Sequence, residues 1–231
     1  MADEPKRRRP ARSALSKEEQ GQQTRERLLR AAVATMSEHG FGATSTTMIV
    51  KRLGITRGAL NHHFADKDEL IMAVGRHLLE ERIGGIGVGI DPGMPVADKL
   101  RLYADSVVAV FLSGDMLVWI DILMTARRDR ATMRRMRQFF NEMDASVYVG
   151  WERLFGRDCH DRATLIAARD VLSNFATGMA INRIFVPTER YWRDVLLFIE
   201  GMLVSRMTAP TPAGWPADPS WSQQFDSPAQ G

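Results

Sequence analysis

Apolar residues recur at intervals of three and four along most of the chain, the period of an amphipathic α-helix. The first such face consists of Leu28, Leu29, Ala32, Val33 and Met36. Ser16 and Glu19 precede it with the spacing of a capping box, and Gly40 follows it at the position of a left-handed cap. Strict polar and apolar alternation, the mark of a half-buried strand, is not convincing anywhere in the sequence. The pattern therefore predicts an all-α protein.

Three shorter helices are predicted next, each preceded by a residue that can cap its free N–H groups. Ser45, Thr56 and Asp66 occupy these positions, and Asp66 with Glu69 has the spacing of a second capping box. Gly54 supplies a sharp turn between the first two of these helices, a combination typical of a helix-turn-helix. The third ends near residue 82, and the glycine-rich stretch GGIGVGIDPGMP then indicates a domain boundary.

Beyond that boundary the same periodicity predicts five further helices, over residues 96–112, 115–127, 132–155, 163–185 and 188–207. Pro187 would end the fourth and Thr188 would cap the fifth. The predicted organisation is a disordered basic arm (1–15), a helix-turn-helix domain with its bridging fourth helix (16–82), a second helical domain (95–207) and an irregular Pro-rich tail (208–231).

Composition and charge narrow the class of protein. Apolar residues make up 45% of the 231 residues, enough for a core, and the apolar runs are too short to cross a membrane. A single cysteine, Cys159, excludes an intrachain disulfide and suits a reducing cytoplasm, so we expect an intracellular, cytoplasmic protein. Residues 1–82 hold 15 Lys and Arg against 11 Asp and Glu, whereas residues 83–231 hold 16 against 17. A basic N-terminal part favours a polyanionic partner.

The short helix at residues 57–63 has a surface suited to DNA. Its outward residues are small or polar: Arg57, Gly58, Ala59, Asn61 and His62. Glycine lets a backbone approach another surface closely, and arginine can donate to a guanine edge or a phosphate. A metal site at His62 and His63 is the alternative, but adjacent helical side chains point about 100° apart and no further ligand has suitable spacing. We expect no metal and no cofactor here.

The stretch TRERLLRAAVATMSEHGFGATSTTMIVKRLGITRGALNHHFADKDELIMAV, residues 24–74, resembles the DNA-binding domain of the TetR family of transcriptional regulators. The resemblance implies that Ser45, Thr46 and Thr47 reach backbone phosphates, that Arg57, Gly58, Ala59 and His62 face the bases, and that Lys67 binds a phosphate. Asn61 departs from the family pattern, which usually has a tyrosine there. We include Asn61 among the DNA-binding residues because its amide can donate to bases or phosphates.

The second domain carries many large apolar residues on helical faces, and 13 methionines suit an adaptable cavity. The predicted effector-binding residues are Phe111, Met116, Trp119, Met124, Phe140, Met143, Trp151, Phe175, Met179 and Asn182. No arrangement of acid, base and nucleophile stands out, so the sequence does not predict an enzyme.

A helix-turn-helix protein usually binds a palindrome as a two-fold dimer. The predicted dimer interface is formed by the last two helices, through Leu165, Ala168, Leu172, Ala176, Gly178, Met179, Trp192, Leu196, Ile199 and Leu203. The sequence thus predicts a homodimeric repressor that a small, largely apolar effector releases from a palindromic double-stranded DNA operator. A non-specific architectural DNA-binding protein is the alternative.

Overall fold

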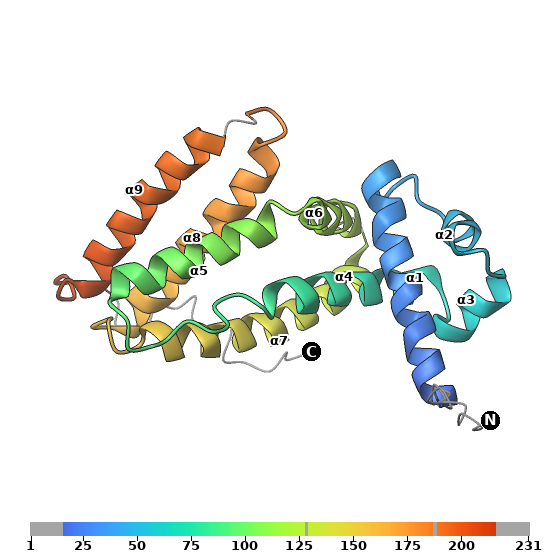
Figure 1. Ribbon diagram of the computed structural model, residues 1–231, viewed down its shortest axis with the longest axis horizontal. Coiled ribbons are helices and arrows are strands. Elements are labelled where there is room, and N and C mark those ends of the chain that lie inside the picture. The colour runs from blue at the N-terminus through green and yellow to red at the C-terminus, as the bar shows by residue number, and fades with distance from the viewer. Residues whose placement is uncertain (1–15, 128, 187–188, 216–231) are drawn as a thin grey trace, which may run out of the picture.

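The computed structural model describes residues 16–127, 129–186 and 189–215, and within these residues it is formed of helices without strands. Three N-terminal helices lie at one end of an elongated molecule, and α4 runs from them into the second group of helices (Figure 1). The helices are α1 Lys17–His39, α2 Thr46–Leu53, α3 Arg57–His63, α4 Lys67–Ile83, α5 Val96–Phe111, α6 Gly114–Ala126, α7 Arg130–Phe155, α8 Arg162–Asn182 and α9 Glu189–Thr208.

The predicted N-terminal caps are present. The side chain of Ser16 accepts from the backbone N–H of Glu19 at 3.1 Å, and Glu19 accepts in return from the N–H of Ser16 at 2.7 Å, so the capping box is complete. Gly40 has the expected positive φ, 78°. Asp66 caps α4, but the Glu69 side chain accepts from the N–H of Ala65 instead of Asp66. The second capping box is therefore shifted by one residue.

Two helix boundaries in the second group of helices differ from the prediction by more than one residue. α7 begins at Arg130 instead of residue 132, because the Asp129 side chain accepts from the N–H groups of Ala131 and Thr132. α8 ends at Asn182, three residues earlier than predicted. Pro187 and Thr188, the arm at 1–15 and the tail beyond 215 lie outside the described residues.

Two clusters of buried side chains form the core. The first joins α1–α4 to α6 and to the first half of α7, and the second joins α5, the end of α7, α8 and α9. Lys99 is buried beside the second cluster, where its Nζ donates to the Leu154 carbonyl at 2.7 Å and to Asp158 Oδ2 at 2.5 Å. The N-terminal helices thus share a core with two helices of the predicted second domain.

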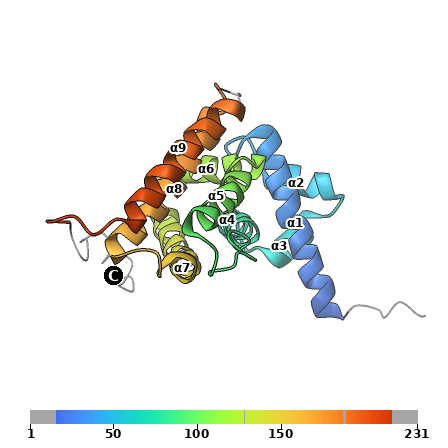
Figure 2. The same cartoon turned by 60° about the vertical axis from the view of Figure 1, so that its left-hand side comes forward.

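The predicted dimer residues need a correction. Seven of the ten are buried within the single chain, because α5 lies against both α8 and α9: Leu165, Ala168, Leu172, Ala176, Met179, Leu196 and Leu203. The outward faces of the same helices carry other apolar residues that are 40–68% exposed: Val171, Ile181, Leu197, Phe198 and Met202. α9 lies along the outer side of the molecule in two views (Figures 1 and 2).

No single helix in the described part of the chain is long and apolar enough to cross a membrane. α5 and α6 together pass the same test of length and composition, but they are bent by 67° at their junction.

Candidate DNA-binding surface and effector cavity

The turn between α2 and α3 has the geometry of a helix-turn-helix. Gly54 adopts the left-handed conformation, with φ 66° and ψ 31°, and its N–H donates to the carbonyls of Val50 and Lys51. Ser45 caps α2, and Thr56 caps α3 by accepting from the N–H of Ala59 at 3.2 Å. These local interactions fix where α3 begins and therefore which of its side chains face outward.

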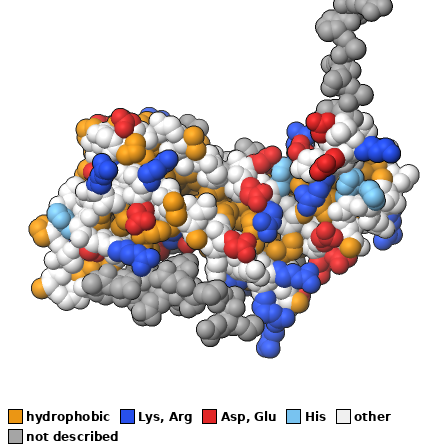
Figure 3. Space-filling model, turned by 90° about the horizontal axis from the view of Figure 1, so that it is seen from below, with side chains coloured by type: hydrophobic (Ala, Val, Ile, Leu, Met, Phe, Trp, Pro, Cys, Tyr) orange, Lys and Arg blue, Asp and Glu red, His pale blue; other side chains and the backbone are white. Residues whose placement is uncertain are grey.

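α3 is fixed by one buried face and exposes the other. Leu60 and the following Phe64 are almost completely buried, and the Arg25 guanidinium lies over the Phe64 ring. Arg57, Gly58, Asn61 and His62 are exposed, and Ala59 is half-buried. At the end of the molecule formed by the N-terminal helices, exposed Lys, Arg and His side chains are interspersed with Asp and Glu (Figure 3).

Gly58 is a glycine for which the fold itself provides no reason. A Cβ atom there would meet only Thr56 Oγ1, at 3.7 Å, and glycine lowers helix stability by about 1 kcal/mol relative to alanine. The absence of a side chain leaves room for another surface to approach the α3 backbone.

The remaining predicted DNA-binding residues surround α3. Ser45 and Thr47 are exposed at the start of α2, Thr46 is half-buried beside them, and Lys67 is exposed at the start of α4. A helix N-terminus presents free N–H groups, which favour a phosphate near Lys67.

His62 and His63 lie edge to face, with ring centroids 5.4 Å apart. Burial of His63, with the neighbouring charges of His62 and Arg25, lowers the pKa of its imidazole, which favours the neutral form. Within the described ranges, no group of three potential metal-ligating side chains occurs.

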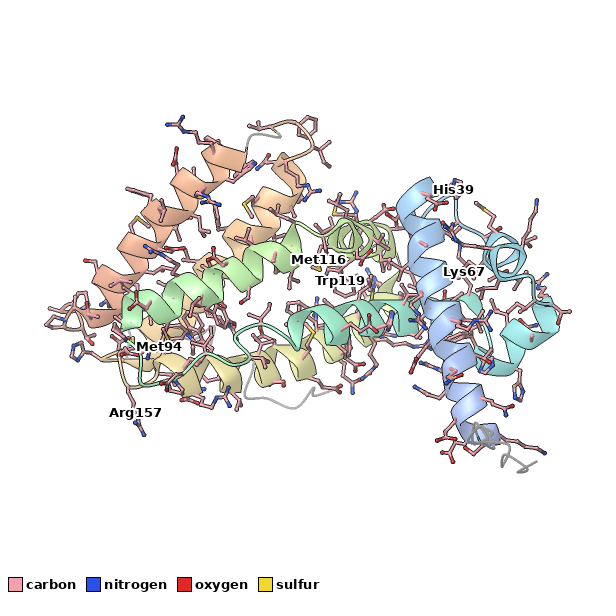
Figure 4. The ribbon with its side chains drawn as sticks, viewed as in Figure 1. His39, Lys67, Met94, Met116, Trp119 and Arg157 are labelled. Carbon is pink, nitrogen blue, oxygen red and sulfur yellow. The ribbon has the colours of Figure 1, made fainter. Side chains whose placement is uncertain are left out.

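A cavity of about 400 Å³ lies inside the second group of helices. It is lined from α4 by Leu79 and Ile83, from α6 by Met116 and Trp119, and from α5, α7 and α8. Met116 and Trp119 lie on the side of α6 that faces α4 and α5 (Figure 4). A small molecule in this cavity would touch both helices that contact the N-terminal helices.

Half of the predicted effector-binding residues line this cavity: Phe111, Met116, Trp119, Phe140 and Met143. The other five do not. Met124 is exposed on the outside of α6, Trp151 is fully buried in the second core cluster, Phe175 packs against that cluster, Met179 is buried and Asn182 is exposed. A helical period gives the inward face of a helix but does not distinguish a cavity wall from a filled core.

The sequence analysis missed the polar wall of the cavity. It consists of Asp144, Arg169, Asp170, Ser173, Asn174 and Thr177, from α7 and α8. Four of these recur at spacings of three and four residues along α8, starting at Asp170. This polar stripe in a mostly apolar helix is the signal in the sequence by which they could have been found.

An exposed helix-turn-helix joined to a helical domain with an internal cavity defines a class of DNA-binding proteins. Residues 28–74 match the family model described as bacterial regulatory proteins, tetR family. The HTH-type transcriptional regulator CymR of Pseudomonas putida is 28% identical over 152 residues, covering 63% of this chain and 71% of CymR. The HTH-type transcriptional regulator BetI of Brucella anthropi is 25% identical over 149 residues, covering 62% of this chain and 73% of BetI.

A solved structure shares this fold over most of the chain. The structure of GusR from Salmonella enterica superposes with a TM-score of 0.65 at 19% identity, covering 84% of this chain and 99% of GusR. Together, the family model, the relatives and the fold identify the chain as a TetR-family, helix-turn-helix regulator of transcription.

Proposed function

We propose that the protein is a homodimeric repressor that binds a palindromic operator through α3 and leaves it when a small, largely apolar molecule occupies the cavity. The proposal rests on the observation that α4 and α6 each pack against the N-terminal helices and also line the cavity. A ligand that favours one placement of these helices shifts the population of the two recognition-helix spacings. The shift requires the ligand to bind one state more tightly by a few kcal/mol.

The contact between α4 and α6 is close at one point. A Cβ atom at Gly75 of α4 would lie 2.9 Å from Cζ3 of Trp119, so the Trp119 ring of α6 packs directly against the α4 backbone. Because Trp119 also lines the cavity, a ligand that displaces its ring would move α4. α4 carries Lys67 at its other end, beside the proposed DNA-binding surface.

A dimer with the outward faces of α8 and α9 in contact fits this function. These faces expose Val171, Ile181, Leu197, Phe198 and Met202, and a two-fold interface is self-complementary. Such a dimer presents two copies of α3 to half-sites separated by one helical turn of DNA, about 34–36 Å, or a multiple.

The function is tested by titrating the protein in a gel-shift assay against DNA upstream of its own gene, with scrambled duplex as competitor at constant salt. A specific regulator is expected to prefer its operator by at least ~10³-fold. Equal competition by the scrambled duplex contradicts the proposal and favours an architectural DNA-binding protein.

Removing the side chain of Asp121 is expected to weaken operator binding without a change at the DNA-binding surface. Asp121 lies on α6, and its Oδ2 accepts from the buried N–H of Phe41 at 2.6 Å, between α1 and α2. Asp121→Ala leaves that N–H unpaired, at a cost of about 1–3 kcal/mol, and loosens the placement of α6 against α1. Thermal unfolding and operator titration measure both effects.

Asp121→Asn is the matched control, since its amide oxygen still accepts from Phe41. We expect it to retain most of the stability and affinity that Asp121→Ala loses. Unchanged operator binding by Asp121→Ala would exclude a coupling role for this hydrogen bond.

A further inference from the structure

The cavity has an excess of negative charge on its polar wall. Among the described residues that line it, three are charged: Asp144, Arg169 and Asp170. Two carboxylates therefore face one guanidinium, which leaves a net charge of −1 when all three are ionised. This imbalance lies in a mostly enclosed site, where electrostatic interactions are stronger than in water.

The guanidinium of Arg169 is already shared by both carboxylates. Its Nε and Nη2 donate to Asp170 Oδ1 at 2.9 and 2.6 Å, and Nη2 lies 3.2 Å from Asp144 Oδ2. Arg169 is only 4% exposed, so its side chain cannot easily leave these partners for water. A negatively charged ligand would have to compete with two carboxylates for one guanidinium, whereas a positively charged ligand would add a partner to them.

The environment of Asp144 also favours a positively charged ligand. Burial raises the pKa of its carboxyl group, and the positive charge of Arg169 opposes this shift only in part. Burial therefore makes the ionised form of Asp144 less favourable than it is in water, and a second positive charge nearby would stabilise that form.

Aromatic side chains form much of the remaining wall: Tyr103, Phe111, Trp119 and Phe140. Aromatic ring faces attract cations, with contributions of about 0.5–2 kcal/mol, and also bury apolar groups. The cavity volume of about 400 Å³ is within the range of small-molecule sites.

From these observations we infer that the cavity selects a small molecule with an apolar body and a single positive charge, held with the charge beside Asp144 and Asp170 and the body among the aromatic rings. The inference deepens the proposed function and rests on it for the role of the ligand as an effector. It narrows the expected ligand from largely apolar molecules in general to cationic ones.

Two probes of the same shape test the inference. Benzyltrimethylammonium and neopentylbenzene differ only by the exchange of a charged nitrogen for carbon, and 3-phenylpropionate serves as the anion. Binding to the full-length protein is measured by the change in its tryptophan fluorescence, to which Trp119 in the cavity wall contributes, and, for the soluble probes, by calorimetry. Apolar burial alone favours the uncharged probe, since a cation loses more hydration. We expect the cation to bind at least ~10-fold more tightly than neopentylbenzene, and the anion to bind least.

Substitutions test whether the two carboxylates of the cavity wall cause the preference for the cation. Asp170→Asn and Asp144→Asn keep the side-chain volume and remove one negative charge, and each is expected to reduce the preference for the cation by about 3- to 10-fold. Glu152→Gln removes a charge from an exposed position on the same helix as Asp144 and is expected to leave the preference unchanged. Circular dichroism of each variant confirms that it is folded.

Three results would overturn the inference: no binding of the cation, binding of neopentylbenzene at least as tight as that of the cation, or equal effects of Glu152→Gln and Asp170→Asn. These experiments contain no DNA, so they are independent of the proposed function. If the cation binds selectively but neither it nor larger aryl ammonium ions release the operator, the selectivity of the cavity stands and its role in derepression fails.

Discussion

Operator binding is expected to fall by about 30-fold to 10⁴-fold when Arg57 is replaced by alanine. One bidentate arginine–guanine contact contributes about 1–3 kcal/mol, and a dimer would lose two of them. Arg57 is the first residue of α3 and is exposed, so alanine should not disturb the helix. Gel-shift titrations of the operator and of a random duplex at the same salt concentration measure the loss.

The random duplex separates two roles of Arg57. If the side chain reads a base, Arg57→Ala weakens operator binding much more than non-specific binding. Equal weakening of both would mean that Arg57 contacts phosphate and would contradict its assigned role. Arg157→Ala is the control, because this substitution removes the same charge and Arg157 is exposed at the end of the molecule opposite to α3 (Figure 4).

The largest loss of stability is expected for Trp151→Ala. Trp151 is fully buried, its ring centroid lies 4.9 Å from that of Tyr103 and 4.1 Å from that of Phe155, and its Nε1 donates to the Leu165 carbonyl at 2.8 Å. Replacement of a buried aromatic residue by alanine costs about 3–5 kcal/mol. For a chain of this size, the melting temperature should fall by about 6–20 °C.

Thermal unfolding followed by circular dichroism measures this effect, and Trp215→Ala is the control. Trp215 is 41% exposed and lies beneath the Arg206 guanidinium, so its loss should change the melting temperature little. If Trp151→Ala were as stable as the wild type but lost ligand binding, Trp151 would belong to the cavity, as the sequence analysis expected.

The parts of the fold that depend on neighbours in sequence were predictable. Ser45, Thr56 and Asp66 cap helices because the side-chain oxygen of each accepts from the N–H group three residues ahead, which needs no tertiary information. Asp129 shows the limit of this reasoning. Its side chain caps α7 from position 129, whereas the apolar periodicity placed the start of this helix at residue 132.

The parts that depend on packing between distant helices were not predictable in the same way. Lys99 is buried because the carbonyl of Leu154, near the end of α7, and the carboxylate of Asp158, in the loop that follows α7, both accept from it, whereas lysine in a helix is normally exposed. Asp144 and Arg169 become a cavity wall only because α7 and α8 lie side by side. The predicted dimer residues failed for a related reason: periodicity gave the apolar faces of α8 and α9 but not which partner covers each face.

The shared core between the N-terminal helices, α6 and the first half of α7 has a consequence for hybrid regulators. A chimera joined within the glycine-rich segment after α4 would place foreign helices against Gly75 and Phe41, without the matching Trp119 and Asp121. Such a hybrid would keep its recognition helix and lose the packing contacts that couple ligand binding in the cavity to the position of that helix. A functional biosensor built from this chain would exchange α3 alone, or transfer α1–α4 together with α6 and the start of α7.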